Sequence, residues 1–340
     1  MSIEKMFEED NYNLDKTNGK ACFPIVSILL AVYKPNYIWL TEQLKSLNEQ
    51  TYENIELLVY DDCPEFQVDE QYFKKYITKF KYTLIKGEEN QGSNKAFEEL
   101  TKIASGDFFA YCDQDDIWEK EKISVMVERF LDRNVTLVCS DLSIIDEEGR
   151  KVANSLTEIR KRHKFKEGYN LAKELLLTNF VTGCAMMVRR DIAYKAIPFE
   201  KTLVHDQWIA IIAALNGKID FLNKSLVRYR QHSFNQTGIL TGIYNKKTYY
   251  NMRIEDFLKR FISLKKRLGN EQEVKEEIDN FILWITARKN YFNNPSIANL
   301  NIMIKYRRFH KISILVEFIL PFLPERIFKY IITLTKKGML

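Results

Sequence analysis

The chain has 340 residues, 46% of them hydrophobic and 13% aromatic, so it can bury a sizeable core and is not globally disordered. Its five scattered cysteines form no CxxC pair, which argues against a disulfide framework or a zinc site and for a reducing compartment. The net charge of +5 is uneven, because residues 241–340 carry a net charge of +10 and residues 1–240 a net charge of −5. A basic segment of this kind suits an anionic surface or a solvated helical bundle.

The first half of the chain alternates between predicted strands and predicted helices. Residues 1–22 are polar, without the apolar stretch of a secretory signal, and are expected to form a loose leader. Continuous apolar runs rich in β-branched residues predict buried strands, and apolar residues at helical spacing predict the helices between them. The predicted strands are 25–32, 55–62, 82–87, DFFAYC from residue 107, and 135–145, and the predicted helices are 37–50, 94–105 and 122–132.

This alternation predicts an α/β fold with a Rossmann-like, mostly parallel sheet, in which ligands bind beyond the carboxyl ends of the strands. Two predicted strands end in acids, the first at Asp61-Asp62 and the second in YCDQDDIW, which contains Asp113, Asp115 and Asp116. Carboxylates one residue apart can hold one hard cation such as Mg²⁺ or Mn²⁺, which also binds substrate phosphates. The alternative is a solvated acidic loop in which Asp116 caps the following helix.

The second half of the chain is expected to be more helical. The predicted elements are a helix, a loop around Gly183, a strand and a helix within 173–197, a helix at 205–217, a strand pair at 219–232, and amphipathic basic helices from 241 onward. The apolar stretch 312–323 is too short to span a bilayer and has basic flanks. It suits an interfacial membrane anchor, a buried core helix or a contact between two copies of the chain.

Three stretches in chain order resemble the family 2 glycosyltransferases of the GT-A fold: VSILLAVYKPN, QTYENIELLVYDD and ENQGSNKAFEELTKIASGDFFAYCDQDDIWEKEKI. The patterns CDQDDIWxxxK and, later, YRQHSFNQTG are similar to the bacterial rhamnosyltransferase-type branch of that family. The resemblance implies a GT-A domain at 23–240, preceded by the leader and followed by a basic helical region at 241–340.

The resemblance implies a site for a nucleoside diphosphate sugar at the strand ends. Ala31 and Tyr33 would line the base pocket, Asp62 would accept a hydrogen bond from the base, and Asp113 would hold the ribose. Gly92 would allow the backbone of its loop to approach the nucleotide closely. The full set of expected substrate-binding residues is Ala31, Tyr33, Asp62, Asn90, Gly92, Asn94, Asp113, Gln114, Thr182, Gly183, Trp208 and Arg230.

The resemblance also implies a metal-dependent inverting reaction. Asp115 would bind Mn²⁺ or Mg²⁺ at the diphosphate, and His232 would complete the metal shell or touch the diphosphate. Arg228 and Arg230 would lie near the phosphates. Asp206, in LVHDQWIAI, would be the general base that takes the proton from the acceptor hydroxyl. Considered without the resemblance, an Asp before an apolar helical run is more typical of a helix N-cap.

Several residues have both an acceptor-side and a structural interpretation. Thr182, Gly183 and Cys184 match the loop that faces the acceptor in the family. Trp118 and Trp208 are expected either to stack against a sugar ring or to pack in the core.

The expected function is a hexosyltransferase that uses a UDP- or dTDP-sugar, with rhamnose favoured by the resemblance, to extend a lipid-linked bacterial surface polysaccharide. It would work in the cytoplasm at the inner membrane, with the basic region against the membrane surface or a second copy of the chain. A nucleotidyltransferase is the alternative enzyme, but VSILLAVYKPNY lacks the Gly-rich phosphate loop of that class. A non-catalytic sugar-nucleotide-binding protein is the other alternative. Nucleic-acid binding is not expected, because the aromatic spacing after residue 241 suits amphipathic helices.

Overall fold

The computed structural model describes residues 23–232, 242–309 and 317–336. The chain divides into two compact units, Met1–His232 and Ser233–Leu340, which are described separately below. The predicted leader, the SFNQTG part of YRQHSFNQTG and the first residues of the apolar stretch 312–323 lie outside the described residues.

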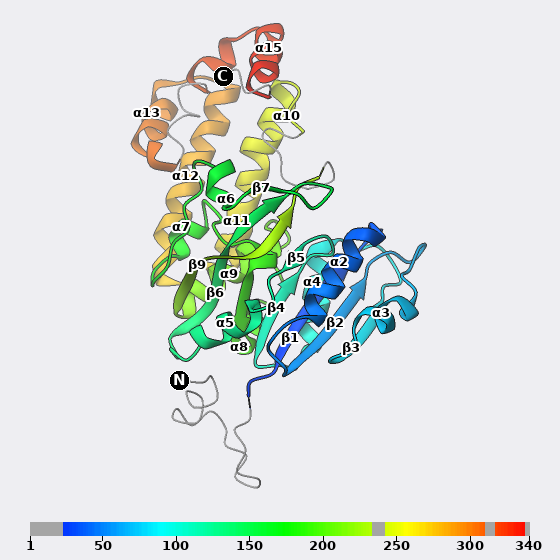
Figure 1. Ribbon diagram of the computed structural model, residues 1–340. Coiled ribbons are helices and arrows are strands. Elements are labelled where there is room, and N and C mark those ends of the chain that lie inside the picture. Colours follow the sequence, from blue (N-terminus) through cyan, green and yellow to red (C-terminus); the bar gives the residue numbers. More distant parts are fainter. Residues whose placement is uncertain (1–22, 233–241, 310–316, 337–340) are drawn as a thin grey trace. The chain divides into compact units, whose positions relative to one another are not determined.

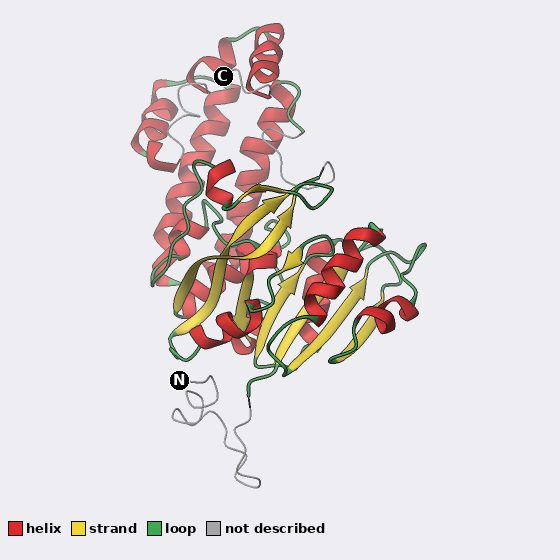
Figure 2. Cartoon of the chain, viewed as in Figure 1, coloured by secondary structure: helices red, strands yellow, loops and turns green. Residues whose placement is uncertain are grey.

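One nine-stranded sheet forms the centre of the first unit (Figure 1, Figure 2). The strands lie in the order β3-β2-β1-β4-β8-β6-β9-β5, and β7 pairs with β6. Their bounds are β1 Val26–Val32, β2 Ile55–Asp61, β3 Lys81–Lys86, β4 Phe108–Cys112, β5 Ile117–Trp118, β6 Val135–Ile145, β7 Lys151–Ala153, β8 Met186–Arg189 and β9 Lys218–Arg230.

The predicted α/β fold is confirmed, and the parallel arrangement holds for the first four strands. Strands β3, β2, β1 and β4 are parallel neighbours, whereas β8 is antiparallel to both β4 and β6. The sheet is therefore mixed. The two pairs that follow one another in the chain, β1–β2 and β2–β3, are each joined through a crossover helix, as parallel pairing requires.

Helices connect these strands and cover the sheet. They are α2 Tyr37–Asn48, α3 Glu70–Tyr76, α4 Ser93–Ile103, α5 Lys122–Arg129, α6 Leu156–Ile159, α7 Ala172–Leu175, the 3₁₀ turn η1 Gly183–Ala185, α8 Arg190–Lys195 and α9 His205–Asn216. Strand order reverses after β3, because β4 pairs with the far side of β1. Right-handed crossovers therefore put α4 on the face opposite α2 and α3. Ligands in open α/β sheets bind at such a reversal, here beyond the ends of β1 and β4.

The prediction of a strand pair at 219–232 is wrong, because β9 is one continuous strand. The exposed Asn223 and Lys224 imitate a turn in the sequence. In the structure, β9 stays paired with β6. The register of this pairing shifts between Ser140 and Asp141, where Asn223 and Lys224 are left without a partner residue on β6. The predicted strand at 135–145 is confirmed with the same bounds, and every residue in it is buried.

The second unit is helical, as its amphipathic pattern predicts. Its elements are α10 Lys246–Tyr250, the π-helical turn η2 Asn251–Glu255, α11 Asp256–Leu268, α12 Gln272–Asn293, α13 Ile297–Lys305, η3 Arg307–Phe309, η4 Leu320–Phe322 and α15 Glu325–Lys336. Tyr249, Phe328 and Ile332 belong to one of its small apolar cores. Arg288 and Glu317 form a buried ion pair that Tyr249 joins by its hydroxyl group. In the part of the chain that is described, none of the helices has the length and apolarity needed to cross a bilayer.

Candidate functional site

The end of β1 lies beside the acidic loop 113–116. Ala31 is half-buried in an otherwise buried strand, and Tyr33 just beyond it is 42% exposed. The Gln114 side-chain amide makes two hydrogen bonds with the Tyr33 backbone. Its Oε1 accepts from the Tyr33 N–H at 2.8 Å, and its Nε2 donates to the Tyr33 C=O at 3.0 Å. Gln114, expected among the substrate-binding residues, therefore anchors Tyr33 and fixes the acidic loop against β1.

The end of β2 is tied to the loop that leads into α4. Asp62 is 3% exposed, and its carboxylate accepts the backbone N–H groups of Gln91 at 2.9 Å and Gly92 at 2.8 Å. Gly92 has a φ of +83°, a conformation that favours glycine. Asn90 lies exposed in the same loop. Asp62 thus shapes the loop that the sequence predicts beside the nucleotide.

The acids that follow β4 crowd together. One oxygen each of Asp113 and Asp116 and the sulfur of Cys184 lie within 4.8 Å of one another. Burial, followed by the charges of Asp116, Asp115 and Asp206, holds the pKa of Asp113 well above its usual range. Burial, and then Asp115, raises the pKa of Asp116 to about 7. The cluster is therefore a place where a cation would relieve repulsion between the half-buried Asp113 and the buried Asp116.

Asp115 and His232, the two residues predicted to bind the metal, lie side by side. His232 Nε2 is 2.7 Å from Asp115 Oδ2, and the imidazole ring packs on Trp39 with a centroid distance of 4.8 Å. The Asp115 side chain is 20% exposed, so it is accessible to a ligand, unlike Asp116, which is 0% exposed.

Arg230 does not face a phosphate site. Its side chain is 0% exposed, and the guanidinium group donates to the C=O of Asp115 at 2.9 Å and to Glu42 at 2.5 Å. Its backbone N–H also donates to Asp116. The guanidinium group of Arg230 is thus paired with Glu42 and supports the backbone of the acidic loop, which corrects its predicted role near the phosphates. Arg228 is paired with Glu119 instead.

Asp206 lies in the first turn of α9, but it is not the N-cap. The cap position is Val204, so the capping interpretation of Asp206 is wrong. Its carboxylate accepts hydrogen bonds from Asn179 Nδ2 at 3.0 Å, from the Gly183 N–H at 3.1 Å and from the Gln207 N–H at 2.6 Å. Burial raises the pKa of Asp206 to about 6, although these donors act in the opposite direction.

Asn94 connects the start of α4 with the segment before Asp206. Its Oδ1 accepts the N–H of His205 at 2.7 Å, and its Nδ2 donates to the C=O of Leu203 at 2.5 Å. Both ends of the amide are therefore used to place the beginning of α9, a role that the sequence pattern does not reveal.

The two tryptophans are core residues. Trp208 is 1% exposed and donates its indole N–H to the C=O of Ala196 at 2.7 Å, so its predicted contact with substrate is wrong. Trp118 is 2% exposed and lies beneath the Lys122 ammonium. A ring must present a free face to stack on a sugar, and both faces are covered here.

The turn η1 borders the acidic cluster. Thr182 is half-buried, and Gly183 and Cys184 are buried. Gly183 and Cys184 thus lie between Asp206 on one side and Asp116 on the other. Two residues in this region, Asn179 and Lys122, were not predicted; Asn179 carries no sequence signal, whereas Lys122 is the lysine of the CDQDDIWxxxK pattern.

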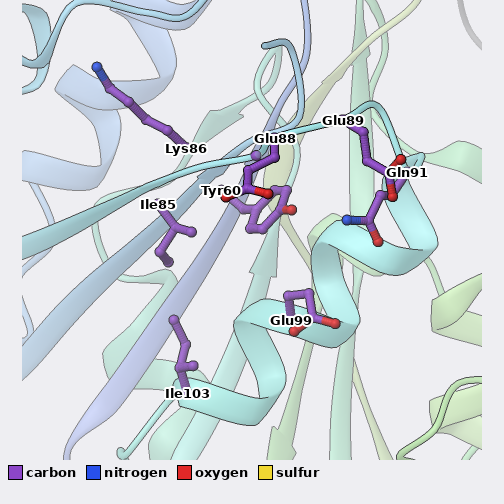
Figure 3. Close-up of a pocket in the computed structure, with 9 residues that line it drawn as sticks. Tyr60, Ile85, Lys86, Glu88, Glu89, Gln91, Glu99 and Ile103 are labelled. Atoms are coloured by element: carbon purple, nitrogen blue, oxygen red, sulfur yellow. The ribbon is translucent and has the colours of Figure 1, made fainter.

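A separate pocket opens beside the Asp62 loop (Figure 3). Figure 3 shows Glu99 and Ile103 of α4 near Tyr60 of β2 around this space. The wall also contains Gln91, whose N–H is held by Asp62. None of the predicted site residues lines this pocket.

A protein-family model described as glycosyl transferase family 2 matches residues 27–196, which contain the sheet edge and the acidic loop. The chain is 28% identical over 238 residues to an uncharacterised glycosyltransferase of Methanocaldococcus jannaschii, with 68% of this chain and 78% of the relative covered. It is 28% identical to the Escherichia coli UDP-Glc:alpha-D-GlcNAc-diphosphoundecaprenol beta-1,3-glucosyltransferase WfgD, covering 55% of this chain and 70% of that protein. It is 25% identical to the Shigella flexneri dTDP-rhamnosyl transferase RfbG, covering 59% and 71%.

The fold is also similar to that of a solved structure, S. aureus TarS 1-349 in complex with UDP-GlcNAc. The TM-score is 0.54 at 19% identity, over 84% of this chain and 81% of that one. At this identity the likeness concerns the fold, which is the GT-A type.

Proposed function

This chain belongs to glycosyl transferase family 2, and on that premise we propose that it transfers a sugar from a nucleoside diphosphate, with inversion, to a hydroxyl group of a growing cell-surface polysaccharide. One observation carries the proposal. The carboxylate of Asp206 accepts the N–H of Gly183 at 3.1 Å. The next residue, Cys184, has its sulfur within 4.8 Å of a carboxylate oxygen of Asp113 and of Asp116, in the loop at the strand ends where such folds bind ligands. A candidate base thus lies beside the predicted donor site.

Asp206 has the properties of a general base. With a pKa of about 6, it is ionised at neutral pH and still accepts a proton readily. The Gly183 and Gln207 N–H groups hold its oxygens in place. As the acceptor oxygen attacks the anomeric carbon, the hydroxyl proton passes to Asp206, and the bond to the diphosphate breaks. A direct displacement inverts the anomeric centre and needs no covalent intermediate.

The carboxylates of the acidic loop fit a hard divalent cation. Asp113 and Asp116 crowd together, and the oxygens of the loop suit Mg²⁺ or Mn²⁺. Burial keeps Cys184 a neutral thiol by raising its pKa well above the usual range, so its sulfur is a poor ligand for these ions. We assign the metal to Asp115 with His232, since Asp115 is accessible. When bound there, such an ion would neutralise charge on the leaving diphosphate.

The names of two relatives support the donor and acceptor classes that we propose. WfgD carries the name of a UDP-glucose enzyme that acts on a diphosphoundecaprenol-linked sugar, and RfbG that of a dTDP-rhamnosyl transferase. We propose a UDP- or dTDP-sugar donor for this chain, with rhamnose first among the sugars to be tested, and a lipid-linked acceptor.

A lipid-linked acceptor requires the enzyme to work at a membrane surface. The second unit exposes apolar side chains next to basic ones in 318–330, where Phe322 is 66% and Tyr330 65% exposed and Arg326 and Lys329 are also exposed. Apolar and basic groups together suit an anionic lipid surface. We propose that this segment docks on the inner face of the cytoplasmic membrane.

Replacing the base tests the proposed function. Asp206→Asn is expected to lower kcat for transfer by about 10²–10⁴-fold, because an amide cannot accept the proton of the acceptor hydroxyl as the carboxylate does. Binding of UDP with Mn²⁺, measured by calorimetry, should be unchanged. Asp191→Asn is the matched control, since Asp191 is an exposed acid in the first turn of α8. A D206N variant that transfers at the wild-type rate would exclude Asp206 as the base.

A further inference from the structure

Lys122 occupies a position that is unfavourable for a lysine in two respects, and the proposed reaction does not explain why. It is the first residue of α5, where a positive charge meets the positive end of the helix dipole. Its side chain is also 0% exposed, and burial lowers its pKa to about 7. Proteins keep such unfavourable placements mainly at functional sites, where the function outweighs the lost stability.

The Lys122 ammonium lies between the acidic loop and the turn η1. Nζ donates a hydrogen bond to the C=O of Cys184 at 2.7 Å, and it lies 3.0 Å from the centroid of the Trp118 ring. Its charge also lowers the pKa of Asp113 and of Asp116, so both acids are within Coulombic range. One side chain therefore contacts the segment that carries the acids and the turn that adjoins Asp206.

The turn η1 transmits this contact to the proposed base. The N–H of Gly183, one residue before Cys184, donates to Asp206 Oδ2 at 3.1 Å. A Cβ atom added at Gly183 would lie 2.7 Å from His205 Nε2, which shows how tightly the turn packs against the start of α9. A shift of the Cys184 carbonyl would therefore move the N–H group that orients Asp206.

We propose that Lys122 is a positioning residue. Its ammonium ties η1 to the acidic loop and thereby holds the Asp206 carboxylate in position beside the donor site. Lys122 does not touch the reacting atoms; it acts through Cys184 and Gly183. The inference rests on the proposed function, since it requires Asp206 to be the base.

Lys122→Met tests this role in the full-length chain, because methionine keeps much of the aliphatic volume and removes the ammonium. We expect kcat to fall about 10- to 100-fold, as for a small misplacement of a reacting group. The Kd for UDP with Mn²⁺ should stay within about 3-fold, since the hydrogen bond of Lys122 is made to η1 and not to a residue proposed to bind the donor. Phe130→Leu, at the other end of α5 and buried in the core, controls for lost stability and should keep the wild-type kcat.

The decisive measurement combines K122M with D206N. If Lys122 acts through Asp206, the double variant is no slower than D206N alone, within about 2-fold. Losses that multiply, or an unchanged kcat in K122M, overturn the inference, whereas full activity in D206N overturns the proposed function instead.

A second variant covers the case in which K122M does not fold. Trp118→Phe weakens the ring contact, and Trp118 Nε1 makes no hydrogen bond within the described residues that could be lost. Its kcat should fall by less than in K122M, and the fall should vanish in the D206N background. A fall that persists there overturns the inference.

Discussion

At the scale of single residues, the site depends on carboxylates whose surroundings differ. Asp115 is partly exposed beside His232, Asp116 is buried behind it, and Asp206 is held by donors from three neighbours. The same side-chain chemistry can therefore serve a cation, the fold and a proton transfer, because burial and hydrogen bonding separate the roles.

The pH dependence of kcat should report Asp206. The base must be ionised, so kcat should fall about 10-fold per unit as the pH drops below about 6, and this limb should be absent in D206N. Because the folded pKa lies above the unfolded value, protonation of Asp206 favours the folded state, and the activity should be lost without unfolding from this group. Circular dichroism at pH 5 checks this. A flat profile between pH 5 and 8 would contradict the assignment.

Nucleotide binding should depend on a divalent cation through Asp115. UDP at about 100 times its Kd should raise the melting temperature by roughly 5 °C, but only with Mn²⁺ or Mg²⁺ present. Asp115→Asn should abolish this shift. Asp116→Asn should keep it, because Asp116 is 0% exposed. The opposite result would assign the ion to the Asp113–Asp116 pair.

At the scale of secondary-structure elements, β4 must lie close to β1 for the acidic loop to meet Tyr33. Gly106, just before β4, donates its N–H to Ser27 Oγ at 2.8 Å. A Cβ atom there would lie 2.7 Å from the C=O of Ile25 and 2.8 Å from the N–H of Ser27. The small residue is therefore a requirement of the packing of β4 against the start of β1.

Gly106→Ala should consequently destabilise the protein. Relief of the backbone clash requires β4 to move from β1, and we expect a loss of about 1–3 kcal/mol in the free energy of unfolding. Urea denaturation measures it. Ile103→Ala, at a side chain that is 51% exposed, is the control and should change stability by no more than about 0.5 kcal/mol. Equal stability of G106A and I103A would show that the backbone of Ile25 and Ser27 leaves room for a Cβ atom at position 106.

At the scale of the whole molecule, the net charge differs in sign between the two units. Residues 241–340 carry a net charge of +10. Segment 318–330 in the same unit exposes aromatic and aliphatic side chains among basic residues. If the acceptor is lipid-linked as proposed, such a surface would bring the enzyme to the membrane in which the acceptor is anchored.

Membrane docking should depend on that segment. The full-length chain should sediment with vesicles containing anionic phospholipid, and Phe322→Asp with Tyr330→Asp should weaken this binding by at least about 10-fold, because two aromatic side chains can no longer enter the interface. Ile297→Asp is the control, at a side chain that is 79% exposed on α13. Equal sedimentation of the double variant and the control would exclude 318–330 as the docking surface.

The sequence by itself determined most of the strands and helices up to β6, the GT-A fold and the family. Continuous apolar runs such as VSILLAV need no tertiary information to be recognised as buried strands, and the acids after β4 are placed by the chain itself. Local patterns failed where distant segments decide the outcome. Asn223 and Lys224 resemble a turn, yet pairing with β6 keeps β9 continuous.

Only the tertiary structure decided which polar side chains face a ligand and which support the fold. Arg230 and Trp208 occupy promising positions in the sequence, but their partners, Asp115 and Ala196 among them, bury both. Asn179 and Lys122 bind segments far away in the chain, so no spacing rule reveals these contacts, although Lys122 itself belongs to the CDQDDIWxxxK pattern. Burial and hydrogen bonding depend on what the fold packs against a residue, and that information is not local.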